Sequence, residues 1–240
     1  MWGNWFFCLA LDRLGQEFLR GFSMKVSNLV FFVLVSVVAV STLCWAYPEP
    51  AIAPALNHWN VDVEYSKPQQ ISVNVPADGA NAAPRRFWYI ILTVTNNSSG
   101  DVPFFPACDL MTDTFKITPA GKDVMGSVFK KIKLAQQGRY PFLESLELVD
   151  DRILQGADNA IDIAIIWPDF DDKAKNVDLF IGGLSNEIVM IDHPLKKDKA
   201  GNPEKVYLRK TLQLKYAIGG DSKFRSDSRM TYKTRNWVMR

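Results

Sequence analysis

The residues best suited to do chemistry form a short acidic stretch. It contains Asp169, Asp171, Asp172 and Asp178, with Asn176 among them. Carboxylates at alternate positions of a loop can converge on calcium, which prefers oxygen ligands. The spacing departs from the calcium-loop pattern D-x-[DN]-x-[DN]-G, because two lysines interrupt it and no glycine occupies the turn. The four aspartates therefore predict a metal site for calcium, and the alternative is a solvated hairpin loop.

A second candidate surface is the C-terminal segment 218–240. From Asp221 onward it carries six lysine or arginine side chains against two aspartates, with aromatic residues between them. Such a mixture of cations and rings is suited to anionic surfaces. We predict a partner-binding surface that consists of Arg225, Arg229, Lys233, Arg235 and Trp237. The alternative is that 232–238 forms a final edge strand and packs Trp237 against the body.

Motifs of catalysis are missing from the sequence. The two histidines, His58 and His193, are too few for a zinc site, which needs three or four clustered ligands. There is no G-x-S-x-G motif, no phosphate-binding loop and no dinucleotide fingerprint. A net charge of +2 gives no reason to expect nucleic-acid binding by the body of the protein. We therefore expect no enzyme activity, and no cofactor other than calcium.

The three cysteines favour a fold without disulfides. Cys8 and Cys44 belong to the N-terminal segment, which leaves Cys108 alone in the remaining chain. A lone cysteine forms no internal disulfide, so the fold must depend on an apolar core. No histidine is near Cys108 in the sequence, which favours an inert buried thiol over a nucleophile.

Residues 1–46 have the pattern of an export signal. A positive residue after Met24 precedes an apolar run from Leu29 to Leu43, and the run ends near the small residue Ala46. We predict cleavage near Ala46 and a location in the periplasm or cell envelope. The alternative is a retained membrane anchor, since the apolar stretch is close to the length that spans a bilayer. Translation starting at Met24 instead of Met1 would explain the aromatic stretch upstream.

The rest of the chain predicts short strands. A proline-rich linker covers 47–56 and a β-sandwich domain covers 57–217. Phe87–Thr95 and 161–167 are dense in β-branched and aromatic residues, as buried strands are. Residues 96–101 form a turn by composition, so we expect 102–105 to pair back as a hairpin. Further strands are predicted by alternating polar and apolar residues at 57–66, 71–75, 177–182 and 206–216.

One helix is predicted after Asp123, which could serve as its cap. Apolar residues recur every third or fourth position, and Gly138 is a reasonable stop. We expect the helix to seal one end or edge of the sandwich. Residues 77–86 are predicted to be a loop and 192–205 a charged, flexible connector. The fold class is therefore all-β: an antiparallel immunoglobulin-like β-sandwich with one short amphipathic helix.

Several stretches resemble an uncharacterised family of secreted proteins from planctomycete-type bacteria. They are FWYIILTVTNNSSGDVPFFP, LMTDT, LQGADNA, FIGGLS, RKTLQLKY and WVMR. The resemblance implies an exported β-sandwich domain and carries over no catalytic residue. More loosely, TVTNNSSGDV looks like immunoglobulin-like modules of bacterial envelope proteins, most of which bind or scaffold.

These observations favour an exported, non-enzymatic β-sandwich that is a structural or protein-binding component of the periplasm or envelope. One alternative is an accessory subunit of a larger periplasmic assembly, docked by its basic tail. Another is a carbohydrate- or calcium-binding module that uses exposed aromatic residues such as Trp59. The expected partner is a protein or an envelope polyanion, and a membrane only through an uncleaved N-terminal segment.

Overall fold

The computed structural model describes residues 51–52, 58–77, 80–220 and 228–240. The export segment 1–46, most of the linker and Arg225 lie outside these residues. The contacts divide the chain into two units. The larger contains Pro50–Ile191 and Val206–Arg240, and the described part of the smaller is Asp192–Lys205.

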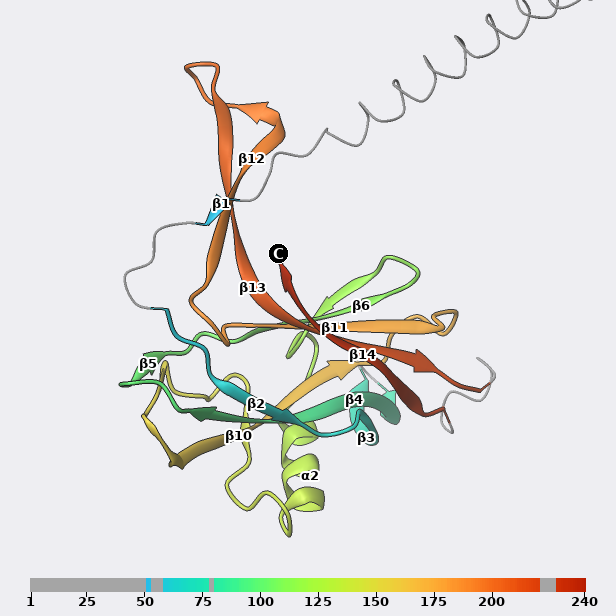
Figure 1. Ribbon diagram of the computed structural model, residues 1–240. Coiled ribbons are helices and arrows are strands. Elements are labelled where there is room, and N and C mark those ends of the chain that lie inside the picture. The colour runs from blue at the N-terminus through green and yellow to red at the C-terminus, as the bar shows by residue number, and fades with distance from the viewer. Residues whose placement is uncertain (1–50, 53–57, 78–79, 221–227) are drawn as a thin grey trace, which may run out of the picture. The chain divides into compact units, whose positions relative to one another are not determined.

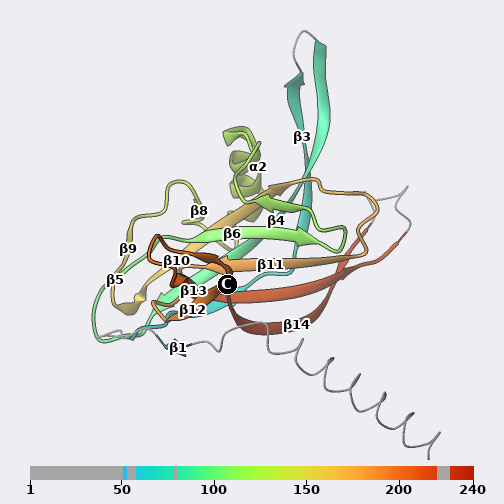
Figure 2. The same ribbon diagram turned by 90° about the horizontal axis from the view of Figure 1, so that it is seen from above.

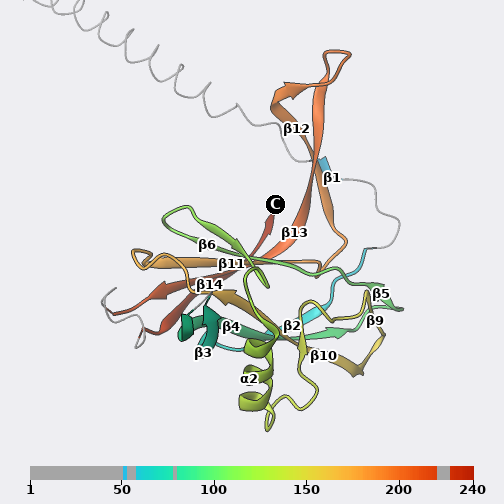
Figure 3. The ribbon, with the colours of Figure 1, turned by 180° about the vertical axis from the view of Figure 1, so that it is seen from behind.

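The larger unit contains two main sheets, which appear as two layers in Figures 1 and 3. The first sheet has the order β1 (Ala51–Ile52), β12 (Ile188–Lys197), β13 (Pro203–Ile218), β11 (Asn176–Gly182), β6 (Ala107–Thr112), β7 (Ile117–Pro119), and β14 (Met230–Met239) also pairs with β13. The second has the order β2 (Asp62–Tyr65), β4 (Ala80–Asn96), β10 (Gly156–Pro168), β8 (Glu144–Ser145), and β3 (Gln69–Ala77) also pairs with β4. The long ladders β3–β4, β4–β10 and β11–β13 are antiparallel. The predicted all-β sandwich is confirmed.

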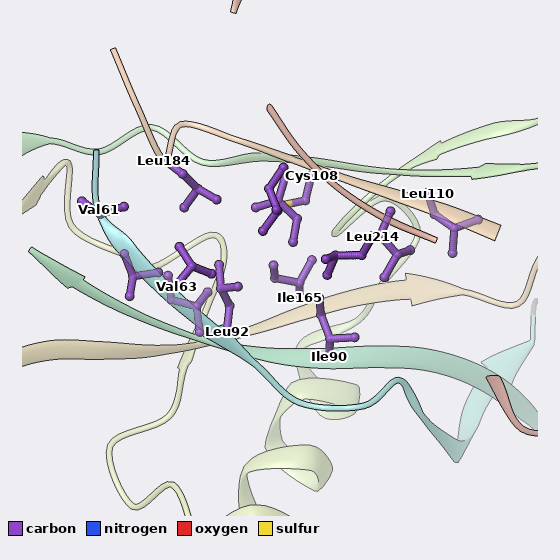
Figure 4. Close-up of a cluster of buried hydrophobic side chains, with 14 of the residues drawn as sticks. Val61, Val63, Ile90, Leu92, Cys108, Leu110, Ile165, Leu184 and Leu214 are labelled. Carbon is purple, nitrogen blue, oxygen red and sulfur yellow. The ribbon is translucent and has the colours of Figure 1, made fainter. Parts of the chain in front are cut away.

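Apolar side chains fill the space between the two layers. Ile90 and Leu92 of β4 point toward Leu110 of β6 and Leu214 of β13, as Figure 4 shows. All four side chains are at most 1% exposed. The strand period of two directs every second residue to this core.

The other faces of β4 and β10 carry a second apolar cluster beneath the helix α2 (Gly126–Gln136). Phe87 and Ile91 of β4 contact this cluster, and Val128 and Ile132 of α2 are fully buried in it. Because both faces of β4 are covered from Phe87 to Val94, this part of its sequence is a nearly continuous apolar run. The helix covers a face of the second sheet, so the expectation that it seals an end or edge was wrong.

The start of α2 also differs from the prediction. Met125 precedes the helix as its N-cap and makes no side-chain capping bond. Asp123, the predicted cap, lies before the helix with a φ of 57°. Neither the positive φ of Asp123 nor the extended backbone of Met125 belongs to a helical turn, so the helix begins later than its apolar period suggests.

One predicted strand pairing was wrong, and two predicted connections turned out to be parts of strands. The segment 102–105 does not return along β4, because β5 (Val102–Pro103) pairs with β9 (Arg152–Ile153). The predicted loop 77–86 is mostly the first part of β4, which pairs with β3 as a two-stranded ribbon that is seen at the top of Figure 2. The predicted connector 192–205 contains the ends of β12 and β13.

The smaller unit, in its described part, is the tip of the β12–β13 hairpin. Asp198 organises the turn, because its carboxylate accepts hydrogen bonds from the backbone N–H groups of Ala200 (2.8 Å) and Asn202 (2.9 Å). Gly201 adopts the positive φ of 87° that the turn requires. Lys205 and Asp192 form an ion pair across the two strands. Asp and Gly in such a turn were a hairpin signal within a stretch that charge alone had marked as a connector.

No helix among the described residues has the length and apolar character needed to cross a membrane.

Candidate functional site

The basic C-terminal segment forms the edge strand β14. It pairs antiparallel with β13, with Leu212 opposite Trp237 and Leu214 opposite Arg235. The edge strand over 232–238 of the alternative prediction is therefore confirmed, but the packing of Trp237 against the body is not, because this side chain is 39% exposed. Most side chains of β14 are exposed, including Lys233 and Arg235.

Aromatic residues join β14 to the second sheet at this edge of the sandwich. The Tyr216 and Tyr232 rings meet edge to face with centroids 5.9 Å apart. The Arg235 guanidinium lies 5.8 Å from the centroid of the Tyr65 ring on β2. Burial, and then a hydrogen bond to Tyr232, raise the pKa of Tyr65. Tyr65 therefore remains neutral, and together with Tyr216 and Tyr232 it packs at this edge and holds β14 in place.

A cavity of about 920 Å³ opens beside this junction, and we call it the basic groove. It lies among the β2–β3 connection, Arg139 just beyond α2, and the residues 228–230 at which β14 begins. Its lining residues are Tyr65, Ser66, Lys67, Pro68, Gln69, Gln70, Trp88, Arg139, Ser228, Arg229 and Met230. The volume falls near the upper end of the range of about 300–1,000 Å³ that is typical of ligand pockets.

The walls of the basic groove are held by hydrogen bonds. The Gln70 side chain donates from Nε2 to the Ser228 carbonyl oxygen at 2.6 Å, which ties β3 to the start of β14. Gln136, at the end of α2, donates from Nε2 to the Tyr89 hydroxyl at 2.9 Å. The same Tyr89 hydroxyl donates to Oε1 of Gln69 at 3.0 Å. These bonds therefore fix β3, β4, α2 and the segment at the start of β14 against one another around the groove.

The charge of the basic groove is one-sided. Lys67, Arg139 and Arg229 line it with exposed side chains, and the described residues that line it include no carboxylate. Within the described part of the chain, none of the three forms an ion pair with another residue. Like charges around a concave surface reinforce one another and raise the local concentration of anions. The groove is therefore suited to an anionic ligand.

The predicted metal ligands are dispersed and mostly engaged by donors. Asp169 pairs with Nε of Arg86 at 3.1 Å and accepts the Trp88 indole N–H at 2.9 Å. Asp178 accepts from Nε2 of Gln213 at 2.9 Å and lies 3.7 Å from Nζ of Lys215. The described residues contain no group of three or more His, Cys, Asp or Glu that could hold a metal ion.

The other two carboxylates of this set differ from each other. The Asp171 carboxylate accepts the Lys173 backbone N–H at 3.0 Å, and both Lys116 and Thr114 contact its Oδ2 at 3.0 Å. These three donors, the backbone N–H first, hold the pKa of Asp171 well below its usual range. Asp172 is exposed. The arrangement stabilises a loop, and the calcium prediction gains no support from it.

A second cavity, of about 400 Å³, brings members of both predicted sites together. It is lined by Met111, Thr112, Asp113, Phe115, Asn176, Asp178, Lys215, Tyr216 and Lys233. Here Nζ of Lys233 donates to Oδ1 of Asn176 at 2.9 Å. The predicted partner-binding lysine thus meets the acidic stretch, whereas Arg229 lines the basic groove and Trp237 lies near Lys210.

The remaining candidate groups have structural positions. Cys108 is 4% exposed in the sandwich core, and burial raises the pKa of its thiol well above the usual range, with a further contribution from Asp109. His193 accepts the backbone N–H groups of Leu195 and Lys196 through Nδ1, at 3.1 and 2.9 Å. His58 is exposed.

Sequence reasoning found Arg229 but missed Lys67 and Arg139. Each of them is a single cation in a polar stretch, with no motif around it. Lys67 and Arg139 come close together only because β3 pairs with β4 and because α2 packs on the second sheet.

No family model, no curated protein and no solved structure matches this chain significantly. The resemblance to secreted proteins of planctomycete-type bacteria stays a prediction.

Proposed function

We propose that the protein is an exported, non-enzymatic β-sandwich that binds an anionic partner of the cell envelope through the basic groove. One observation carries the proposal: Lys67, Arg139 and Arg229 come from three distant parts of the chain and line one cavity, and no carboxylate is among its described lining residues. A cluster of this kind costs electrostatic self-repulsion, which a bound anion relieves.

Binding fits the described side chains better than catalysis does. The thiol of Cys108 is enclosed in the core. The aspartates Asp169, Asp171 and Asp178 accept hydrogen bonds from neighbouring donors. A general base or nucleophile must reach a substrate atom, and these groups are directed to partners within the protein.

The partner that the groove favours is an extended polyanion with carboxylate or phosphate groups. Arginine binds such groups with its planar fork, and lysine binds them as a point charge. The groove adjoins β14, whose exposed Arg235 lies over the ring of Tyr65, a lining residue, and adds a further cation beside the groove. An acidic protein subunit would use the same charges and is the competing occupant.

The test measures binding of two anionic polymers by titration calorimetry: polygalacturonate, a saccharide chain, and polyglutamate, a peptide chain. The groove variant Arg139→Glu/Arg229→Glu should lose at least about tenfold in affinity for the saccharide polymer. The control Lys197→Glu/Lys199→Glu makes the same change of charge at exposed positions of the hairpin tip and should keep the wild-type affinity.

Equal losses of affinity in the groove variant and in the control would show that only the net charge of the protein matters. This result would overturn the proposal. Tighter binding of polyglutamate than of polygalacturonate would replace the envelope polyanion by an acidic protein subunit. Affinity should fall steeply as the salt concentration rises, because dissolved ions screen the attraction between the cations of the groove and the anionic polymer.

Export is a separate part of the proposal, and it is motivated by the apolar run before Ala46. Mass spectrometry of the protein from the native envelope should find a mature N-terminus near Tyr47. Recovery from the membrane fraction of a chain that still contains residues 24–46 would show that the segment is a retained membrane anchor and is not cleaved.

A further inference from the structure

A strained and exposed aromatic residue marks the hairpin between β6 and β7. Phe115 has a φ of 60° and its side chain is 88% exposed. A bulky residue at positive φ is a genuine outlier, and such a conformation is strained. The exposed ring offsets none of this strain by burial in the protein.

The surrounding contacts hold Phe115 in that conformation. Its N–H donates to the Thr112 carbonyl at 2.9 Å, and the Thr112 N–H donates to the Lys116 carbonyl at 3.0 Å. On either side of the phenylalanine, Thr114 and Lys116 both bind Oδ2 of Asp171 at 3.0 Å.

A second set of bonds fixes the same hairpin from the next loop. The Asp113 carboxylate accepts the backbone N–H groups of Lys175 and Asn176, each at 3.1 Å, and Nδ2 of Asn176 at 3.1 Å. Strained residues persist where the surroundings over-determine them, and they concentrate at functional sites. The acidic stretch thus acts as a clamp that presents one aromatic ring.

The cavity beside this ring has a distinct chemistry. Phe115 and Met111 give it apolar surface, and the rim carries Asp113 and Asp178 against Lys215 and Lys233. The formal charges of its described lining residues therefore balance, in contrast to those of the basic groove. Its volume of about 400 Å³ lies within the usual range for small ligands.

We propose that this cavity is a second binding site, independent of the basic groove, and that it takes a neutral saccharide with one apolar ring face on Phe115. Sugar hydroxyls both donate and accept, so they can replace water at the carboxylates and at the ammonium groups of the rim. A purely apolar ligand would remove water from these four charged side chains without replacing the hydrogen bonds that the water made. A small anion would gain from the lysines and lose to the aspartates.

The test measures the binding of neutral trisaccharides to the full chain by NMR and calorimetry at millimolar concentration. The set contains cellotriose, maltotriose, mannotriose and tri-N-acetylchitotriose, with trigalacturonate as the anionic counterpart. Wild-type protein should bind at least one of the neutral sugars, and Phe115→Gly should weaken that binding by at least about tenfold.

Thermal unfolding of the same variant checks that the loss is not a folding defect. Phe115→Gly should keep or raise the midpoint, because glycine adopts positive φ without the strain. The matched control is Phe142→Gly, which removes a phenylalanine that is 83% exposed at another place and should leave sugar binding unchanged.

Failure of all four neutral sugars to bind, or unchanged binding in Phe115→Gly, would overturn the inference. The groove variant Arg139→Glu/Arg229→Glu should retain neutral-sugar binding, and Phe115→Gly should retain polygalacturonate binding. The two proposals therefore fail separately.

Discussion

Gly183, just beyond β11, is a position where the backbone conformation and its surroundings allow only glycine. Its φ is 85°, and a Cβ atom added to it would lie 2.6 Å from the Phe105 carbonyl oxygen. Gly183→Ala should therefore lower the free energy of unfolding by about 2 kcal/mol or more, since it combines a steric clash with left-handed strain. Chemical denaturation measures this loss.

Gly100→Ala is the matched control, because nothing lies within 4 Å of a Cβ atom at that position. Its free energy of unfolding should stay within about 0.5 kcal/mol of the wild type. Similar losses in both variants would show that the close approach to Phe105 is not the cause.

Cys108 should resist alkylation in the native protein. Burial raises the pKa of its thiol well above the usual range, so the reactive thiolate is scarce and enclosed. Iodoacetamide at mildly alkaline pH should leave the Cys108 peptide unmodified, and denaturant should make it react. Rapid labelling of this peptide in the folded protein would contradict the buried position.

Asp171 should make stability depend on pH in a defined direction. Its pKa is held below the usual range, so the unfolded chain takes up a proton first as the pH falls. Its contribution is therefore fully present above about pH 4, the ordinary pKa of an aspartate, and declines below it toward the lowered folded pKa. Urea titrations should find Asp171→Asn less stable than wild type at neutral pH.

The difference between Asp171→Asn and the wild type should shrink as the pH falls below about 4. Asp172→Asn, the exposed neighbour, controls for the loss of one negative charge. A stability difference between Asp171→Asn and the wild type that stays constant with pH would show that the stabilising effect of Asp171 does not depend on its ionisation.

At the scale of elements, the helix α2 stabilises the second sheet through one face only. Ile132 is fully buried, whereas Leu134, two residues further, is 74% exposed. Ile132→Ala should lower the free energy of unfolding by about 2–5 kcal/mol, and Leu134→Ala should change it by less than about 0.5 kcal/mol. Denaturant unfolding of the two variants checks the pair. A comparable cost for both would mean that α2 packs with a different face.

The strands that could be predicted from sequence are those whose burial is visible in composition. Phe87–Thr95 and 161–167 are apolar on both faces because one core lies between the sheets and another lies under α2. The partner of a strand is not encoded so locally. Residues 96–101 have turn chemistry, yet β5 leaves β4 and pairs with β9, so a turn signal does not specify a hairpin.

A buried polar side chain helps to explain why β5 pairs with β9 and not with β4. Asn96 is completely buried, and its side-chain amide donates to the carbonyl oxygens of Gly100 (2.9 Å) and Ile153 (3.0 Å). The asparagine thus connects the turn to β9 instead of letting the chain return along β4. An asparagine in a turn has local hydrogen-bonding choices, and its long-range partner becomes known only with the tertiary structure.

At the scale of the whole molecule, the candidate sites could be predicted only in part. Charge composition found Arg229, Lys233 and Arg235, because they are close together in sequence. The balance of charge in each cavity depends on residues that the topology assembles, such as Lys67 with Arg139 and Lys215 with Asp178. The acidic stretch was a conspicuous pattern, and its carboxylates mainly position a neighbouring hairpin.

The ladder between β4 and β10 also limits when this protein can fold. It pairs Val94 with Ile161 and Trp88 with Trp167, so the centre of the second sheet closes a long loop. Pairings of such sequence separation slow folding, and β4 has only β2 and β3 as partners until β10 is available. A chain that crosses a membrane from its N-terminus would therefore pass most of its length unfolded. On the proposed export route, this late pairing of β4 with β10 would favour translocation of the chain before the core closes around Trp167.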